Sequence, residues 1–354
     1  MSSSAKNKKA TTRKIQFWLI LLGIVLVAVG LLIFFLTGDD MYEVTTFSMG
    51  TYVSQRVYGK NREEGARLAA QAVQELDDLI SWRSGTGDVA AINAAAGSDF
   101  VPLDGRTERV LRSAMDVCEK SGGALDITIA PISLLWDFDN NPHLPPDDMI
   151  QKFLTKVDFS ALSLPGDGTA ALRLHETAID LGAVGKGAAC DAAIDAYQQA
   201  GVSRAVVAVG GSIGVYGKKP FGEPWKIAIR DPNGDGGLGT ISLTEGFVST
   251  SGSYEKYFTE NDKTYHHLLD PDTGYPAENG LLSVTVKSKE GALSDGLSTA
   301  CFVLGPEKSL PLLKEFDADA VFVAEDRQVY VTEGIWEDFT PNGDGFYAVK
   351  LLPE

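Results

Sequence analysis

Histidine and cysteine are scarce in this chain of 354 residues, with four and three copies respectively. The cysteines, Cys118, Cys190 and Cys301, lie far apart, and no Cys-x-x-Cys or Cys/His pair has the spacing of a zinc site. Each one stands among small or apolar neighbours, so we expect three buried, small hydrophobic side chains rather than metal ligands.

Acidic side chains are absent from the first 36 residues, which hold five Lys and Arg followed by an uncharged run. That run is long enough to cross a bilayer of about 30 Å at roughly 1.5 Å per residue. A cleaved signal peptide, the alternative, usually has an apolar core of only about 7–15 residues. No cysteine ends the run, which excludes lipid attachment to a cysteine there. By the positive-inside rule we expect a cytosolic basic tail over 1–14, a transmembrane anchor over 15–36, a tether over 37–45 and an extracytoplasmic domain over 46–354.

Beyond the anchor the chain has little positive charge: 26 Lys and Arg remain against 48 Asp and Glu, a net charge of −22. Such a surface repels nucleic acid and anionic lipid, so we expect no nucleic-acid partner. A phosphate-bearing ligand would therefore need a local site in which a metal ion and backbone N–H groups offset the repulsion.

Alternating and helical patterns predict one α+β domain with mixed or antiparallel sheets and flanking helices. No internal repeat is visible, and no long linker follows residue 45. We expect helices at 63–79, 107–121, within 145–158, and at 187–200, 295–303 and 307–316. We expect a hairpin over 42–57 and further strands at 178–183, 204–209, 225–229, 239–243, 246–249, 280–286, 320–323 and 328–332.

Two segments concentrate polar side chains, YHHLLDPDTG at 265–274 and SDGLST at 294–299. Asp295 and Thr299 share one face if their segment is helical, and such an oxygen pair suits Mg²⁺ beside a phosphate. His266 and His267 would point to opposite faces of a strand, so at most one of them faces a site.

Three other patterns suggest chemistry. Residues 210–214 match the Gly-x-Ser-x-Gly of a serine hydrolase, but the segment after them is not helical, as that motif requires. Residues 182–187 form either a tight turn or a Gly-rich phosphate loop that opens a helix. Residues 231–236 resemble the start of a calcium loop, but Ser242 stands where the bidentate Glu belongs, so a hairpin turn is favoured.

Taken in order, seven segments between about residues 46 and 305 resemble the ApbE family, the FAD:protein FMN transferases. They are Met-Gly-Thr at 49–51, Gly-x-x-Asp-x-Thr at 123–128 with Trp136 after it, Asp-Leu-Gly-Ala-x-x-Lys-Gly at 180–187, Gly-Gly at 210–211, Thr-Ser-Gly-x-Tyr at 250–254, His-Leu-Leu-Asp-Pro-x-Thr-Gly at 267–274 and Ser-Asp-Gly-Leu-Ser-Thr at 294–299. The resemblance implies a T-fold-like catalytic domain. It also implies an enzyme that cleaves FAD, places FMN on a Thr or Ser hydroxyl of an acceptor protein and releases AMP.

The resemblance also implies roles for residues. Mg²⁺ would be held by Asp295, Thr299 and the backbone carbonyl of Ala183, and His267 would help the acceptor hydroxyl lose its proton. Contacts to FAD would come from Met49, Trp82, Asp126, Thr128, Lys186, Gly210, Gly211, Thr250, Ser251, His267 and Asp270. The partner would be a redox flavoprotein at the outer membrane face.

The chain departs from the family pattern at several positions. The segment 81–93 has Gly87 and Asp88 where the family has Ser and Glu, and Ser212 follows the glycine pair where Asn or Asp is common. Two alternatives remain open: an Mg²⁺-dependent FAD pyrophosphatase that passes the phosphoryl group to water, and a flavin-binding protein without catalysis. The pair Asp295 and Thr299 argues against the second, since a carrier needs no metal clamp.

Overall fold

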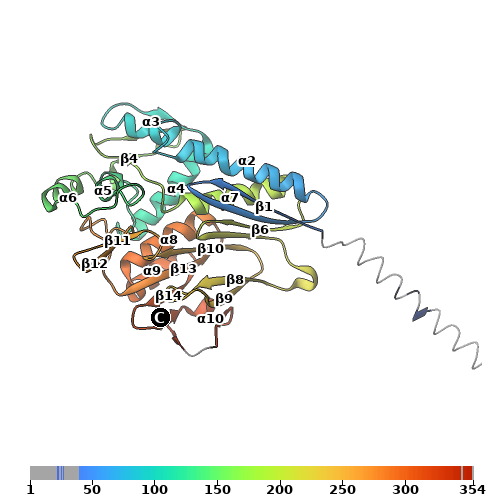
Figure 1. Ribbon diagram of the computed structural model, residues 1–354. Helices are drawn as coiled ribbons and strands as arrows, with labels where there is room; N and C mark the ends of the chain where they lie inside the picture. Colours follow the sequence, from blue (N-terminus) through green and yellow to red (C-terminus); the bar gives the residue numbers. More distant parts are fainter. Residues whose placement is uncertain (1–21, 24, 26, 28–39, 344–345, 353–354) are drawn as a thin grey trace, which may run out of the picture.

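The computed structural model describes residues 22, 23, 25, 27, 40–343 and 346–352, and they form the predicted α+β architecture (Figure 1). The strands are β1 (Met41–Ser48), β2 (Thr51–Tyr58), β3 (Val101–Pro102), β4 (Leu162–Ser163), β5 (Thr169–Leu172), β6 (Arg204–Val209), β7 (Ser212–Tyr216), β8 (Trp225–Arg230), β9 (Gly237–Leu243), β10 (Gly246–Gly252), β11 (Tyr257–Glu260), β12 (Lys263–His266), β13 (Leu281–Ser288), β14 (Asp319–Ala324), β15 (Gln328–Val331), β16 (Phe339–Pro341) and β17 (Ala348–Leu351). The α-helices are α2 (Arg62–Ile80), α3 (Asp88–Ala94), α4 (Gly105–Lys120), α5 (Ala130–Trp136), α6 (Asp147–Leu154), α7 (Gly185–Gln199), α8 (Gly291–Leu304), α9 (Pro306–Glu315) and α10 (Glu333–Trp336).

The main sheet has nine strands in the order β1-β2-β6-β7-β10-β13-β14-β15-β17 within the described chain. Neighbours pair antiparallel except β15 and β17, which are parallel, so the sheet is mixed as predicted. In β2 the buried residues Val53, Gln55 and Val57 occupy every second position, as the two-residue period of a strand requires, whereas β13 is buried on both faces around Val284 and Val286.

Helices cover one face of this sheet, and a small sheet covers the other. Figure 1 shows α2, α4, α7 and α8 along one side of the main sheet. The antiparallel strands β8, β9 and β16 pack their apolar side chains against β14 and β15 on the opposite face. The site discussed below lies among the helices, where the sheet and α8 meet.

A separate cluster of aromatic and aliphatic side chains joins α5, α6 and the β11–β12 hairpin. Trp136 is fully buried there, stacks on Phe138 and donates its indole N–H to the Gly274 carbonyl over 2.8 Å. This bond ties the loop after β12 to α5, so Gly274, 138 residues downstream of Trp136, is fixed by it.

Most predicted elements are confirmed within a few residues, and the three cysteines are free and buried as expected. The predicted strand at 178–183 is wrong: Ala178 makes one isolated parallel bridge to Ile129, and a turn then leads into α7. Residues 41–45, expected in the tether, are the start of β1, because they pair with β2.

The predicted anchor at 15–36 lies almost entirely outside the described residues. Among the residues that are described, no helix has the length and apolar character needed to cross a membrane.

The turn at residues 231–236 joins β8 to β9, with the Asp231 N–H donating to the Gly236 carbonyl over 2.9 Å. The hairpin interpretation of this segment is confirmed.

Candidate active site

The centre of the site is a crossing of α7 and α8 at which the two backbones touch. A Cβ atom added to Gly187 would lie 1.9 Å from the Gly291 carbonyl oxygen, and one on Gly291 would lie 2.2 Å from the Gly187 carbonyl oxygen. No real Cβ atom can take either position, so both residues must be glycine. The close approach of α8 therefore explains why the second glycine of the Gly-Lys-Gly at the start of α7 is required, which the sequence did not reveal.

Asp295 lies on α8 at this crossing with only 3% of its surface exposed. Its Oδ2 accepts a hydrogen bond from the Gly187 N–H over 3.0 Å, and the Lys186 ammonium is 3.8 Å away. Burial raises the pKa of Asp295, while the Lys186 charge, the Gly187 N–H and the Ser212 hydroxyl act in the opposite direction. A buried carboxylate beside a single cation is suited to accept a further positive ligand.

Thr299 lies one turn along α8 from Asp295, as predicted from the sequence. Its hydroxyl is 3.0 Å from the Ser251 hydroxyl of β10, which is also 2.7 Å from the Ser298 hydroxyl. Thr250, the neighbouring residue of β10, shares a hydrogen bond of 2.9 Å with Thr285 of β13. The hydroxyls of Ser251, Ser298 and Thr299 line the joint between α8 and the main sheet, whereas Thr250 and Thr285 alternate with the residues that face α8 and therefore lie on the other face.

A divalent cation at this place would bind oxygen donors of mixed kinds. No cluster of three or more His, Cys, Asp or Glu in the described ranges could hold a metal by itself. Asp295, Thr299 and the carbonyl of Ala183, two residues before α7, supply only oxygen, which fits the preference of Mg²⁺. So few protein donors leave coordination positions for substrate oxygens.

The glycine pair after β6 brings this loop against Lys186. Gly210 has φ +55°, and a Cβ there would lie 3.2 Å from Lys186 Cδ; a Cβ on Gly211 would lie 2.9 Å from the Thr250 carbonyl oxygen. The structure thus brings together Lys186, Gly210, Gly211 and Thr250, four of the predicted FAD contacts.

Ser212 begins strand β7, not a helix, which confirms the argument against a serine hydrolase. The side chain is buried, its Oγ accepts a hydrogen bond from Ser249 over 3.0 Å, and it contributes to the pKa balance of Asp295. The sequence had marked Ser212 only as a departure from the family pattern. Its contact with Asp295 needs the fold, because 83 residues separate the two.

His267 follows β12 and is half-buried, and its Nδ1 is a buried atom with no hydrogen-bond partner within the described part of the chain. Burial lowers the pKa of His267 most, and together with the charges of Lys256 and Lys186 it brings that pKa to about 3. The ring is therefore neutral at pH 7 and has a free nitrogen. His266 instead places Nε2 3.2 Å from the Ala277 carbonyl oxygen and packs on Phe302, so its ring has internal partners.

Three loops meet beside His267 through one carboxylate that the sequence did not single out. Asp139 lies 2.6 Å from Arg83 and 2.5 Å from Lys256. Burial opposes ionisation of Asp139, but the hydrogen bond from Lys256 and the nearby charges leave its pKa lowered. The Arg83 guanidinium also lies over the Trp82 ring at 4.5 Å, which places Trp82 at the edge of this group.

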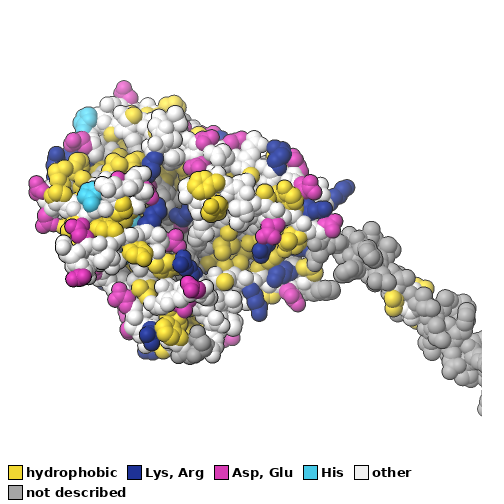
Figure 2. Space-filling model, in the orientation of Figure 1, with side chains coloured by type: hydrophobic (Ala, Val, Ile, Leu, Met, Phe, Trp, Pro, Cys, Tyr) yellow, Lys and Arg dark blue, Asp and Glu magenta, His cyan; other side chains and the backbone are white. Residues whose placement is uncertain are grey.

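Figure 2 shows a hollow near the centre of the visible face, over the region where Figure 1 places α4 and α8. Lys and Arg side chains gather at its rim, although the chain as a whole is acidic. Local positive charge of this kind favours an anionic ligand.

Met49 forms the two-residue turn of the β1–β2 hairpin with Gly50. Both have positive φ, +54° and +68°, the geometry of a type I′ turn. Asp77 of α2 stabilises it by accepting the Met49 N–H over 2.6 Å and the Ser48 hydroxyl over 2.9 Å. The structure thus fixes Met49 at the hairpin end, half-buried.

Other predicted FAD contacts have internal partners. Asp126 accepts the N–H and the hydroxyl of Thr128 over 2.7 and 2.6 Å, and the Phe159 N–H over 2.9 Å. Thr128 is fully buried, and its hydroxyl oxygen accepts a hydrogen bond from the Asp158 N–H. Asp270 shapes the 270–274 loop, with its carboxylate accepting the Asp272 N–H over 2.9 Å. As flavin contacts these three stay predictions; in the structure they brace loops.

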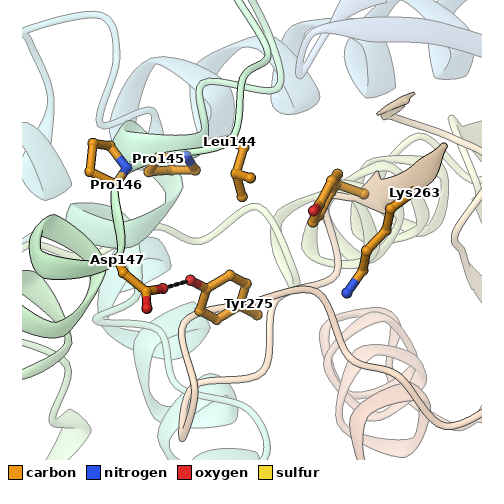
Figure 3. A pocket seen from close by; sticks show the side chains of 7 residues that line it. Leu144, Pro145, Pro146, Asp147, Lys263 and Tyr275 are labelled. Carbon is orange, nitrogen blue, oxygen red and sulfur yellow. Dashed lines mark hydrogen bonds between the residues drawn. The ribbon is translucent and has the colours of Figure 1, made fainter. Parts of the chain in front are cut away.

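A cleft of about 510 Å³ lies elsewhere, between the loop before α6 and the β12 region (Figure 3). Tyr275 points toward Asp147 and donates its hydroxyl to that carboxylate across one end of the cleft. None of the described residues that line it is a predicted site residue. They are Leu144, Pro145, Pro146, Asp147, Lys263, Tyr265 and Tyr275.

One family accounts for most of the chain. The model of the ApbE family matches residues 49–322. The chain belongs to the ApbE family. The resemblance drawn from seven sequence segments is thereby confirmed.

Relatives of this ApbE chain are named as transferases. The chain is 33% identical to the FAD:protein FMN transferase of Treponema pallidum, with 83% of this chain and 87% of the relative covered. It is 27% identical to the FAD:protein FMN transferase of Klebsiella pneumoniae, with 89% and 99% covered. The prediction of an enzyme from this transferase family is confirmed.

Solved structures agree with the fold. The ApbE protein of Thermotoga maritima superposes with a TM-score of 0.79 at 29% identity, covering 84% of this chain and 99% of that one. The flavinyl transferase ApbE of Pseudomonas stutzeri gives 0.71 at 28% identity, covering 81% and 92%.

Proposed function

We propose that this ApbE chain transfers FMN from FAD to a Thr or Ser hydroxyl of an acceptor flavoprotein, in an Mg²⁺-dependent reaction that releases AMP. The acceptor oxygen forms a new P–O bond to the FMN phosphorus, and the P–O bond to AMP breaks. The observation that carries the proposal is the buried Asp295 at the α7–α8 crossing, with Thr299 one turn away and Lys186 at 3.8 Å.

The α7–α8 side of the site would hold the pyrophosphate. Mg²⁺ bound by Asp295, Thr299 and the Ala183 carbonyl would supply charge neutralisation to that group. Lys186 adds a positive charge close to the Gly210–Gly211 loop, which approaches without side chains. Because these groups stand in place before the substrate arrives, they need little rearrangement as charge develops.

His267 would accept the proton of the acceptor hydroxyl. Its pKa of about 3 is low for a base, yet part of the cause is repulsion by Lys256 and Lys186. An anionic pyrophosphate beside these lysines would offset that repulsion and raise the basicity of the ring. The unpartnered Nδ1 is then available for the proton.

We also propose that residues 15–36 anchor the enzyme, with 1–14 in the cytosol and the catalytic domain outside. The acceptor would then be a redox flavoprotein at the outer membrane face. This arrangement is supported by the order of charges along the first 40 residues: a basic segment comes first, an uncharged run follows, and Asp39 and Asp40 come after it. Protease added to intact cells should digest the catalytic domain; full protection of it would contradict this arrangement.

The decisive test is Asp295→Ala in the full-length protein, incubated with FAD, Mg²⁺ and an unmodified acceptor flavoprotein. We expect fluorescent labelling of the acceptor to fall by at least about 100-fold, because the metal loses its only carboxylate. Asp317→Ala, which removes a carboxylate that is 80% exposed, is the control and should label at the wild-type rate.

Labelling by a folded Asp295→Ala protein at near the wild-type rate would refute the metal assignment. Equal release of free FMN with and without the acceptor would show that the enzyme is a pyrophosphatase instead.

A further inference from the structure

The two helices that cross at the site bond to each other in a reciprocal way. The Gly187 N–H in the first turn of α7 donates to Asp295, one turn into α8. The Gly291 N–H and Ala292 N–H in the first turn of α8 donate to Asp191, in the second turn of α7, over 2.7 and 2.8 Å. Each helix therefore supplies the carboxylate that satisfies the free N–H groups of the other.

The sequence repeats the same five-residue pattern at both places. Residues 187–191 read GAACD and residues 291–295 read GALSD. The glycines touch backbone to backbone, and each aspartate follows its glycine by four residues, one helical turn. A local two-fold relation thus exchanges α7 with α8 and Asp191 with Asp295. The pattern is too short to be recognised as a repeat without the structure.

The two aspartates use their oxygens differently. Both oxygens of Asp191 are occupied by α8 N–H groups, whereas Asp295 takes Gly187 and lies beside Lys186. The Glu290 side chain makes no hydrogen bond at the start of α8, so Asp191 is the carboxylate that caps this helix. Burial raises the pKa of Asp191 to about 7, although the hydrogen bonds from the Gly291 and Ala292 N–H groups act to lower it. The fold thus keeps a costly buried carboxylate at this position.

We propose that Asp191 is a positioning residue of the active site: by capping α8 it holds Asp295 at the orientation in which it accepts the Gly187 N–H and can bind the metal. The catalytic part of this proposal rests on the proposed function, whereas the hydrogen bonds between α7 and α8 do not depend on it. With no side chains between the two backbones at Gly187 and Gly291, a shift of α8 at its capped end moves Asp295 with it.

The test is Asp191→Asn in the full-length protein, which keeps the shape and removes the charge and one acceptor. Amide hydrogen exchange is followed at Gly291 and Ala292, and at Gly187. We expect exchange to be at least about tenfold faster at all three, because loss of one cap loosens the other. The control is Asp195→Asn, one turn further along α7, where the carboxylate is 53% exposed and faces Arg109 at 3.5 Å; it should leave all three amides unchanged.

A second readout is the half-saturating Mg²⁺ concentration for FAD turnover. We expect Asp191→Asn to raise it about tenfold with kcat at saturating Mg²⁺ within about twofold of wild type, since the chemical groups remain. A merely structural role would lower Tm without moving this concentration.

Faster exchange at Gly291 and Ala292 with unchanged exchange at Gly187 would overturn the proposal, as would an unchanged Mg²⁺ requirement in an enzyme that turns over FAD. Should Asp191→Asn not fold, Asp191→Ser, which retains one oxygen acceptor, replaces it with the same criteria. Absence of FAD turnover in the wild type would refute the proposed function instead, and the exchange experiment alone would then judge the positioning role.

Discussion

The two sides of the active site are built on different principles. The α7–α8 side is held by backbone groups and by Asp295, which is 3% exposed. The His267 side is held by Arg83, Asp139 and Lys256, long or charged side chains that are between 31% and 52% exposed. Where two backbones touch, almost no side chain can replace the glycines. Exposed ion pairs, in contrast, are weak, and their side chains can separate and pair again. The side proposed to hold the metal and phosphates is thus rigid, whereas the ion pairs on the side proposed to meet the acceptor can adjust.

The largest effect should come from Gly187→Ala, which adds a methyl group at the crossing of α7 and α8. A methyl group 1.9 Å from the Gly291 oxygen must push α7 and α8 apart. We expect a loss of about 3 kcal/mol in the free energy of unfolding, measured in urea, and loss of FMN transfer. Gly185→Ala is the matched control, because its methyl would lie 3.4 Å from the Ile80 side chain, an ordinary contact. Equal stability of the two variants would contradict the close crossing.

His267→Ala should have the next largest effect, confined to catalysis. We expect transfer to slow by roughly 100-fold, in the range for loss of a general base, while the Kd for FAD changes by less than about threefold. Equilibrium binding and single-turnover labelling separate the two. Loss of FAD binding in a folded variant would show that the ring binds substrate rather than taking the proton.

The pH dependence of stability gives a separate test of the same side chain. Because the pKa of His267 is about 3 in the folded protein and about 6.5 in an unfolded chain, the unfolded state binds the proton first on acidification. Its contribution to stability is therefore complete above pH ~6.5 and is lost as pH falls toward 3, by at most about 1.4 kcal/mol per pH unit. Urea titrations should show a shallower slope in this window for His267→Gln than for the control His143→Gln.

Asp139→Asn should have the smallest effect, because it breaks only exposed ion pairs. We expect a loss below about 1 kcal/mol that shrinks further at high salt. Unfolding in urea at low and high salt measures it. A loss as large as that of Gly187→Ala would erase the contrast between the two sides.

The sequence predicted the six longer helices and about half of the described strands because their periodicity is local, but it did not predict the short helices α3, α5 and α10. It predicted the pair Asp295 and Thr299 because one helical turn separates them. The strand expected at 178–183 failed because only Ala178 finds a partner, the single bridge to Ile129. Local patterns contain no information about such partners.

The same limit explains the site residues that sequence patterns did not indicate. Ser212, Asp139 and Asp191 act through contacts with segments between 56 and 117 residues away. Asp126 and Thr128, which the family motif marks, turn out to satisfy each other and the Phe159 and Asp158 N–H groups. Motifs locate the neighbourhood of the site, but which atoms remain free follows from packing.

The three buried cysteines can report when the domain opens, because they are inaccessible in the folded protein. Burial raises the pKa of Cys118 and of Cys301 to about 12, and that of Cys190 well above its ordinary value, so none forms the thiolate that reacts with oxidants or alkylating reagents. A maleimide dye should not label the native protein, and the rate at which it labels the cysteines would then report how often α4, α7 and α8 open, two of which cross at the candidate site.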